Sequence, residues 1–491
     1  MKILMVYCDM PQGNVVPIGV TRVITSLKKA GHEVELFHTT FYRQAYKSST
    51  ELRVEGLQFK SCTLQYNSSD MCEDFRAKIQ SFSPEVIGFS VVEPSFHIFK
   101  KLLNSACDII SSSQIKVAVG GVHAICWPES CSALTGVDFI SVSEAENTFV
   151  DLCNCISDGK SYKDQPGFWI RVGTKWRKNR PVSLVNIDTL PVPDYSAFGD
   201  RFLMKPMMGK IRRTVSIELS RGCPYKCTYC ADAYLTDQFR QLGRWYRLKS
   251  ISKIDEEYSL LVEKYKPEFV FKVSESFLAV SKARLKDYYA VYKRYRLPFW
   301  VETRPETINE ETGKMLSELN CIRVSVGVES GNEAYRKKYL NRGYSNKHVT
   351  EAARILHKYG IGFSMNLIIG LPFETRKMIF DGIELMRRSK PEGVTTFFFT
   401  PYKGSVLRRI CEENDMIDRD FIGEDYFQNK YVLRNNGFSE KDIIGLWRTA
   451  PLYAHLPKSR YPIIRKAERL DREGNKCFRG LKEEYYEKMG W

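Results

Sequence analysis

The chain has 491 residues, 43% of them hydrophobic and 13% aromatic, and its 74 Lys and Arg against 58 Asp and Glu give a formal net charge of +16. This length predicts two or three domains, and the composition excludes a disordered, fibrous or membrane-spanning chain, because no apolar run is long enough to cross a bilayer. The charge favours an anionic partner or reflects only a solvated surface, and the lack of a basic block with interleaved aromatics disfavours nucleic acid.

The first third of the chain alternates strands and helices. Apolar runs typical of buried strands lie at residues 2–8, 34–37, 85–90, 116–121 and 138–142, and helical periodicity lies at 18–30, 99–110 and 145–156. Near-continuous apolar strands that alternate with helices predict a doubly wound parallel sheet, Rossmann-like, over residues 1–155.

Ligands of such sheets bind where the strands end. The residues at those predicted ends are Asp9, Gly13, Ser90, Gly120, Gly121, His123 and Glu144. The double glycine would let a flat ligand approach the backbone closely, although a tight strand-to-helix turn explains it equally well. A lone histidine such as His123 is more often a structural residue than a metal ligand.

Residues 156–195 form a linker in this interpretation. Periodicity weakens there, and the stretch 188–195 contains two prolines and is expected to be extended. We expect this segment to set the geometry between two domains.

The next part, residues 196–403, predicts a second sheet. Strand-like runs lie at 214–219, 269–273, 299–302, 322–328, 362–369 and 395–400, with helical stretches at 253–263, 351–359 and 376–386 between them. This is the pattern of a partial β/α barrel of about six strands, whose chemistry lies at the carboxyl ends of the strands. Residues 404–491 are mixed helical and basic and are expected to form a small cap that shapes substrate access.

Directly after the first barrel strand come Cys223, Cys227 and Cys230, spaced C-x3-C-x2-C. Three thiolates on one short loop can hold three irons of a cubane cluster and leave the fourth iron open. A structural zinc site is the alternative, but it would need a fourth ligand, usually from a second cysteine pair, and none follows. The chain has 14 cysteines and no signal peptide, which favours a reducing compartment, the cytoplasm.

The loop, with Tyr229 as the aromatic before its last cysteine, resembles the signature of the radical S-adenosylmethionine (radical SAM) superfamily. The resemblance implies a [4Fe-4S] cluster whose open iron binds SAM. It also implies that the reduced cluster cleaves SAM to a 5′-deoxyadenosyl radical, with an electron donor such as flavodoxin or ferredoxin.

The same resemblance assigns SAM contacts at successive strand ends. Glu275 follows the second strand, where the family has an acidic pair, although Ser274 replaces the first acid here. Arg304 follows the third strand and is a candidate for the SAM carboxylate or an anionic substrate. The Gly-x-Glu-Ser-Gly turn supplies Glu329, and the Gly-Leu-Pro turn after the fifth strand supplies Gly370 beside adenine, with Phe373 in place of the second glycine.

The first domain resembles the cobalamin-binding domain that precedes the barrel in cobalamin-dependent radical SAM enzymes. The segment from Gly120 to Glu129, followed by Ser143–Glu146, is similar to that family. One departure is that the loop after Asp9 has no histidine to ligate cobalt from below. The resemblance covers nearly all of residues 1–405.

We therefore expect a cobalamin-dependent radical SAM methyltransferase that acts on an unactivated carbon of a small-molecule, lipid or peptide substrate through the adenosyl radical and methylcobalamin. A cyclisation, rearrangement or carbon–carbon coupling without methyl transfer is the alternative. A non-catalytic iron–sulfur or zinc scaffold is a third, and it predicts no SAM cleavage.

Overall fold

The computed structural model describes residues 1–9, 16–43, 49–58, 60, 65–423 and 430–490. Its contacts divide the chain into two compact units. The N-terminal unit comprises Met1–Ser49, Thr63–Lys205 and Leu235–Leu260, and the barrel unit comprises Thr50–Cys62, Pro206–Tyr234 and Leu261–Trp491. The domains predicted from the sequence are continuous segments. The contacts instead assign residues 50–62 to the barrel unit and residues 235–260 to the N-terminal unit.

The sheet of the N-terminal unit has seven strands in the order β2-β1-β3-β4-β5-β6-β7. The strands are β1 (Lys2–Tyr7), β2 (Glu33–His38), β3 (Val86–Ser90), β4 (Lys116–Gly120), β5 (Phe139–Ser141), β6 (Phe168–Val172) and β7 (Lys175–Lys178). Pairing is parallel from β2 to β5, as predicted, and antiparallel from β5 to β7. The middle of the predicted linker, residues 168–178, therefore forms an edge of this sheet.

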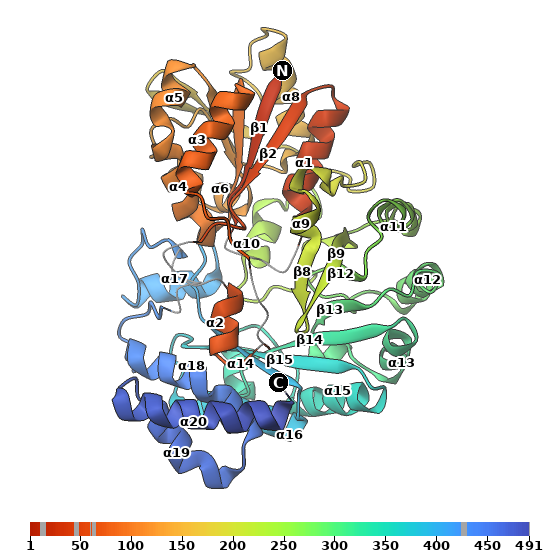
Figure 1. The fold of residues 1–491 in the computed structure, drawn as a ribbon, viewed down its shortest axis with the longest axis vertical. Coiled ribbons are helices and arrows are strands. Elements are labelled where there is room, and N and C mark those ends of the chain that lie inside the picture. The colour runs from red at the N-terminus through yellow and green to blue at the C-terminus, as the bar shows by residue number, and fades with distance from the viewer. Residues whose placement is uncertain (10–15, 44–48, 59, 61–64, 424–429, 491) are drawn as a thin grey trace. The chain divides into compact units, whose positions relative to one another are not determined.

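Helices cover both faces of this sheet, with α1 against α8 on one face and α3 against α4 on the other (Figure 1). They are α1 (Ile18–Lys29), α3 (Met71–Phe82), α4 (Phe96–Ser105), α5 (Cys107–Ser112), α6 (Val122–Cys126), α7 (Pro128–Ser132), α8 (Ala145–Ser157) and α9 (Asp200–Leu203). The sequence starts α3 sharply, because the Asp70 carboxylate accepts hydrogen bonds from the backbone N–H groups of Cys72 and Glu73. The doubly wound fold is confirmed.

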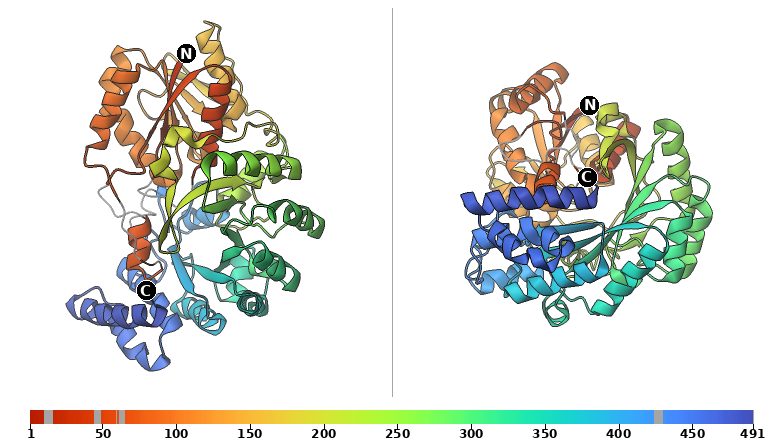
Figure 2. Two further views of the ribbon diagram at one scale, coloured as in Figure 1. Left: turned by 45° about the vertical axis from the view of Figure 1, so that its right-hand side comes forward. Right: turned by 60° about the horizontal axis from the view of Figure 1, so that its bottom comes forward.

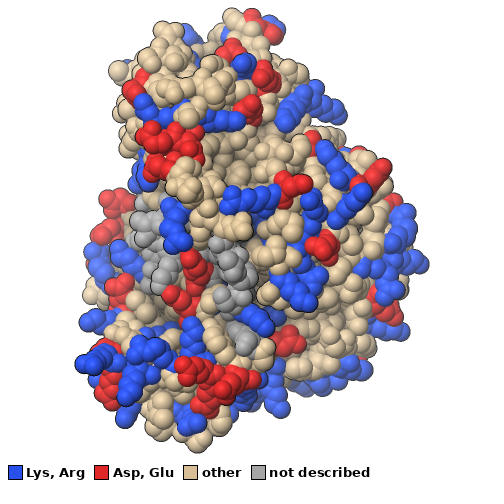
Figure 3. Space-filling model, viewed as in Figure 1, with Lys and Arg blue, Asp and Glu red and all other residues tan. Residues whose placement is uncertain are grey.

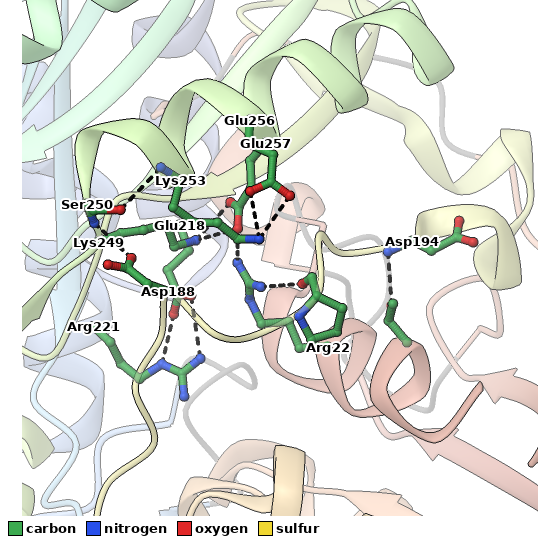
Figure 4. A network of polar contacts seen from close by, with 12 residues as sticks. Arg22, Asp188, Asp194, Glu218, Arg221, Lys249, Ser250, Lys253, Glu256 and Glu257 are labelled. Atoms are coloured by element: carbon green, nitrogen blue, oxygen red, sulfur yellow. Dashed lines mark hydrogen bonds and ion pairs between the residues drawn. The ribbon is translucent and has the colours of Figure 1, made fainter. Parts of the chain in front are cut away.

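A buried ionic network fixes the end of the linker to the N-terminal unit (Figure 4). The guanidinium of Arg22 on α1 lies 2.7 Å from Glu257 and donates to the carbonyl of Pro191 at 2.6 Å, and Lys249 lies 2.8 Å from the same carboxylate. The side chains of Arg22, Lys249 and Glu257 have no exposed surface. One carboxylate thus serves two buried cations, and the proline-rich stretch is held through its backbone.

The barrel unit contains a second seven-stranded sheet in the order β16-β15-β14-β13-β12-β9-β8. Its strands are β8 (Met204–Met207), β9 (Lys210–Glu218), β12 (Phe269–Val273), β13 (Phe299–Thr303), β14 (Cys321–Glu329), β15 (Gly362–Ile369) and β16 (Gly393–Phe398). All neighbours from β9 to β16 pair in parallel. The curled sheet is open between its edges, which confirms the partial barrel (Figure 2).

Helices lie on the convex side of the curled sheet (Figure 2). They are α11 (Ile251–Tyr265), of which only the last third, from Leu261, belongs to this unit, α12 (Lys282–Tyr292), α13 (Glu310–Glu318), α14 (Glu333–Tyr339), α15 (Asn346–Lys358) and α16 (Arg376–Ser389). The periodicity predicted α11, α15 and α16 but not α12, α13 or α14. The buried residues of α12 are Leu285, Tyr288 and Tyr292, two of them tyrosines.

The C-terminal helices pack beside the last strand. They are α17 (Val406–Glu413), α18 (Glu440–His455), α19 (Tyr461–Ala467) and α20 (Arg472–Met489). Helix α2 (Ser49–Glu55), with residues 56–58 after it, joins this cluster. Gln58 donates to the carbonyl of Thr396 on β16, Tyr485 donates to the carbonyl of Leu57, and a Cβ on Gly56 would stand 2.6 Å from the Trp447 ring. An early segment of the chain thus completes the last part of the barrel unit.

On the face shown in Figure 3, Lys and Arg are interspersed with Asp and Glu. Among the described residues, no helix is both long and apolar enough to cross a bilayer.

Candidate functional site

The three cysteines lie on a loop between the first barrel strand and a helix. β9 is followed by β10 (Ser220–Arg221), by Gly222 with a φ of +77°, and by the loop itself, which ends where α10 (Ala231–Gln238) begins. Cys227 is buried, and Cys223 and Cys230 are partly exposed. The positive φ explains the glycine, because other residues rarely adopt that conformation.

Backbone contacts hold this loop against the segment after α14. The Asn341 side chain donates to the carbonyl of Lys226 at 2.8 Å, and the Thr228 hydroxyl donates to the carbonyl of Tyr339. From the other side, the N–H of Leu407 donates to the carbonyl of Thr228 at 3.0 Å. The loop is therefore positioned by two other parts of the barrel unit.

The three thiols suit a cluster, because soft thiolates on one short loop can each bind a different iron of a cubane. Among the described residues, no group of three His, Cys, Asp or Glu side chains is placed to hold one metal ion. Burial raises the pKa of Cys223 to about 12, so the thiol holds its proton until a metal displaces it.

Glu275 lies after β12 and has no hydrogen-bond or ion-pair partner among the described residues. The residue is exposed, yet burial raises the pKa of its carboxyl to about 8, with a further contribution from Asp232 and Glu302. Neighbouring protein atoms and the two nearby carboxylates thus disfavour the charged form of Glu275, although its side chain keeps exposed surface. An unpaired carboxyl in such a place suits the ammonium of SAM, and this contact stays a prediction.

Glu329 ends β14 in a strained conformation. Its φ is +67°, and the register with β15 shifts between Gly327 and Glu329. Such strain in a residue that is not glycine is typical of functional sites. Its carboxylate lies 3.6 Å from the guanidinium of Arg342, and the hydroxyl of Tyr229 accepts a hydrogen bond from the same guanidinium at 2.7 Å. Tyr229 and Glu329, both predicted SAM contacts, are thus brought together.

Arg304 is buried and already engaged. Its Nε lies 2.6 Å from Glu306, its guanidinium stacks 3.8 Å from the centre of the Tyr225 ring, and Nη1 lies 3.9 Å from the sulfur of Cys227. It is therefore at the cluster loop, and a contact with the SAM carboxylate stays a prediction.

The turn after β15 has positive φ angles at both positions where the family pattern has glycine, Gly370 and Phe373. Gly370 has a φ of +74°, and its N–H donates to the buried Glu374 carboxylate at 2.8 Å. Phe373 takes a φ of +61° in place of the expected glycine, and its N–H donates to Asn436 at 2.7 Å. The backbone of Phe373 thus adopts a strained conformation, which the hydrogen bond from its N–H to Asn436 stabilises.

In the N-terminal unit, several predicted cobalamin contacts gather at the carboxyl edge of the sheet. Asp9 follows β1, and Thr39 and Thr40 donate to its carbonyl and carboxylate. Ser90 and Gly120 are paired neighbours on β3 and β4. Gly121 has a φ of +97°, and a Cβ there would stand 2.3 Å from the carbonyl oxygen of Val91. Gly13 lies outside the described residues.

His123 and Glu144 already have partners in the structure. His123 is only 1% exposed. The centre of its ring lies 4.4 Å from that of the tilted Phe96 ring, and its Nε2 lies 2.8 Å from the Ser130 hydroxyl. Glu144 accepts two hydrogen bonds from Arg247, at 2.8 and 2.5 Å. A role for either side chain toward cobalamin stays a prediction, and for His123 it would require the ring to leave its packing.

Three residues near these sites were not assigned a role from the sequence. Arg342 lies behind the cluster loop. Glu302 lies on the same face of the sheet as its neighbour in register, Ser325, whose hydroxyl accepts a hydrogen bond from Asn366. Lys205 is buried in the N-terminal unit, where burial lowers its pKa to about 8 and Asp9 partly offsets the shift. No local motif marks them, and only Glu302, two residues before Arg304, stood within a stretch that the sequence singled out.

Two family models match the chain. The B12 binding domain matches residues 6–153, and the radical SAM superfamily matches residues 217–386. These ranges contain most of the strand ends described above, including the three cysteines and Gly121.

Relatives of similar length share the sequence at low identity. An uncharacterized methyltransferase of Pyrococcus horikoshii is 25% identical over 70% of this chain and 73% of its own length. A cytidylyl-2-hydroxyethylphosphonate methyltransferase of Streptomyces wedmorensis is 22% identical over 82% of this chain and 79% of its own. An anaerobic magnesium-protoporphyrin IX monomethyl ester cyclase of Rubrivivax gelatinosus is 21% identical over 69% of this chain and 61% of its own.

Solved structures share the fold. The radical SAM methyltransferase TsrM from Kitasatospora setae, with cobalamin and a [4Fe-4S] cluster bound, has a TM-score of 0.63 and 15% identity and covers 100% of this chain and 99% of its own. The cobalamin-dependent radical enzyme OxsB has a TM-score of 0.67 and 14% identity and covers 100% of this chain and 72% of its own. By its two family models, the chain consists of a B12-binding domain followed by a radical SAM domain, the combination found in cobalamin-dependent radical SAM enzymes, whose cofactors are a [4Fe-4S] cluster, SAM and cobalamin.

Proposed function

We propose that the chain is a C-methyltransferase that acts on an unactivated carbon of a small-molecule, lipid or peptide substrate. The observation that carries the proposal is that one chain combines the three-cysteine loop with a B12-binding domain that has Gly120 and Gly121 at the carboxyl edge of its sheet. The methyltransferases among the relatives support it.

When bound, the cofactors supply a 5′-deoxyadenosyl radical and a transferable methyl group. The protein's own residues bind and orient. Cys223, Cys227 and Cys230 would hold three irons, and Glu275 would accept hydrogen bonds from the SAM ammonium. Tyr229, Arg304, Glu329 and Gly370 would border the rest of SAM. At the sheet edge of the N-terminal unit, Asp9, Ser90 and Gly121 would border cobalamin.

The concave side of the half-barrel is the proposed substrate site. Glu302, which we assign to that side, makes no hydrogen bond or ion pair with another described residue. Burial raises the pKa of its carboxyl, although Arg53 lowers it in part. The guanidinium of Arg53 lies 5.2 Å from the centre of the Phe397 ring on β16. A carboxylate and a guanidinium close enough to influence one another suit a substrate that carries a hydrogen-bond donor and also, as the net charge favours, an anionic group.

We also propose a cytoplasmic location and a low-potential electron donor such as flavodoxin or ferredoxin. The cysteines among the described residues are all unpaired, which suits a reducing compartment. Because the chain has a formal net charge of +16, charge complementarity favours an acidic donor.

The test is anaerobic reconstitution of the cluster with added hydroxocobalamin, followed by desalting and ultraviolet–visible spectroscopy. The products formed from SAM after addition of dithionite are then measured. Methyl transfer predicts retained corrinoid bands and, with substrate present, both 5′-deoxyadenosine and S-adenosylhomocysteine. Cluster absorbance without corrinoid would contradict methyl transfer.

The second candidate is a cyclase or coupling enzyme without methyl transfer, which the similarity to the Rubrivivax gelatinosus cyclase favours. It predicts 5′-deoxyadenosine without S-adenosylhomocysteine and a product that has lost hydrogens. The mass of the product therefore separates the two candidates.

A further inference from the structure

Arg342 is a buried arginine directly behind the cluster loop. It follows α14, and its side chain is only 4% exposed. Its Nη2 donates to the carbonyl of Gly327 at 2.6 Å, and its Nη1 donates to the hydroxyl of Tyr229 at 2.7 Å. One guanidinium thus joins β14 to the cysteine loop.

The same guanidinium reaches the sulfur of Cys227. The distance from Nη1 to Sγ is 3.8 Å, and the nearest carboxylate, that of Glu329, lies 3.6 Å away. The Nε of Arg342 is buried and has no hydrogen-bond partner among the described residues. A buried cation that one carboxylate approaches only to 3.6 Å is stabilised by a further negative charge nearby, and a cluster thiolate at Cys227 supplies that charge.

We propose that Arg342 is a positioning residue that holds Cys227 and Tyr229 in place and raises the reduction potential of the cluster through its charge. One-electron reduction adds a negative charge to the cluster and its thiolates, the electron coming from a low-potential donor. A fixed positive charge and an N–H···S contact stabilise the reduced form more than the oxidised form. The inference rests on cluster binding and not on methyl transfer.

Arg304 approaches the same sulfur, at 3.9 Å, but its situation differs. Its Nε lies 2.6 Å from Glu306, so a carboxylate close by compensates its charge. It is also a candidate SAM contact, so its substitution would change two properties together. Arg342 therefore provides the cleaner test.

Arg336 is a matched control on α14. It is fully buried, donates to the carbonyls of Ser330 and Tyr344 at 2.5 and 2.8 Å, and lies 4.3 Å from the centre of the Tyr344 ring. No contact with a cysteine of the loop is recorded among the described residues. Substitution of Arg336 removes a buried guanidinium but leaves the positive charge of Arg342 beside the sulfur of Cys227 in place.

The experiment is a redox titration of the full-length, reconstituted protein without SAM, followed by electron paramagnetic resonance. The variants are Arg342→Gln, Arg342→Met and Arg342→Lys, with Arg336→Gln as the control. We expect the first two to lower the equilibrium constant for reduction about tenfold, which is ~59 mV for a one-electron couple. Arg342→Lys, which keeps the charge, should restore most of the loss, and Arg336→Gln should match the wild type.

Equal potentials in the wild type, Arg342→Gln and Arg342→Met would overturn the proposal. The titration reports only the loaded fraction, so partial loss of iron does not hide the result. Complete loss of iron from both variants, with unchanged circular dichroism, would also overturn it, in favour of a role confined to holding the loop. Because neither readout involves methyl transfer, a failed methyltransferase assay leaves this result unaffected.

Discussion

Gly327 and Glu329 share one small space at the end of β14, where a Cβ on Gly327 would stand 2.5 Å from Oε1 of Glu329. The absent side chain is what lets the carboxylate lie between the strand and Arg342. The glycine of the Gly-x-Glu-Ser-Gly turn is thus explained by the position of its glutamate.

Gly327→Ala should displace Glu329 and weaken SAM binding about tenfold or more, because about 1.4 kcal/mol of lost contact corresponds to a factor of ten. Equilibrium binding of SAM to the reconstituted protein measures the effect, and iron content should be unchanged. Gly480→Ala is the control, since its Cβ would meet nothing within 4 Å. Equal affinity in Gly327→Ala and the wild type would argue against a SAM role for Glu329.

Gly121→Ala should abolish corrinoid retention. The φ of +97° and the close carbonyl of Val91 force the backbone to move, and strain of this kind costs of the order of 1–3 kcal/mol. Gly120→Ala, whose Cβ would lie 3.4 Å from the Ser141 side chain, should perturb the backbone less. Corrinoid absorbance after desalting measures both variants, and iron content shows that the cluster is intact. Full corrinoid retention in Gly121→Ala would contradict binding at this edge.

His123 should make the protein sensitive to acid. Burial lowers the pKa of its ring from 6.5 to about 3, so between these values the unfolded state holds more protons than the folded state, and stability falls as the pH is lowered. At pH 5 this ring alone costs ~2 kcal/mol relative to neutral pH. Denaturant unfolding at pH 7.5 and 5 should show a smaller difference for His123→Gln than for the wild type. An equal difference would mean that the ring is protonated in the folded protein.

Glu257→Gln should destabilise the N-terminal unit by about 3–5 kcal/mol, because it leaves the buried charges of Arg22 and Lys249 without their carboxylate. Glu256→Gln, at the preceding residue of α11, is the control. The half-exposed carboxylate of Glu256 pairs with Lys253, and such surface pairs contribute about 0–1 kcal/mol to stability. Thermal unfolding measures both. Similar shifts for the two variants would mean that water or another group compensates the buried cations.

Local patterns predicted most of the fold. The strands at 269–273 and 362–369 agree with β12 and β15 to the residue, because each is a continuous apolar or alternating run between clear breaks. The cysteine loop was also identifiable, since its chemistry resides in its spacing. The backbone conformation at Phe373 could not be predicted from its residue type, because phenylalanine rarely adopts the positive φ that this turn has there.

Long-range contacts produced the features that the sequence did not predict. Arg342 acquires its importance only because α14 places it behind a loop more than 100 residues earlier in the chain. The segment at residues 56–58 has no motif, and its partners on β16, α18 and α20 are distant in sequence. Such contacts depend on how elements pack and not on local periodicity.

The contact between Leu57 and Tyr485 has a consequence for synthesis of the protein on the ribosome. The two residues are 428 positions apart, and translation at 5–20 residues per second takes roughly 20–90 s to cover that distance. During this interval the early segment has been made while its partners on the last helices have not. The barrel unit can therefore reach its final packing only after the chain is nearly complete, which makes its folding dependent on the end of translation.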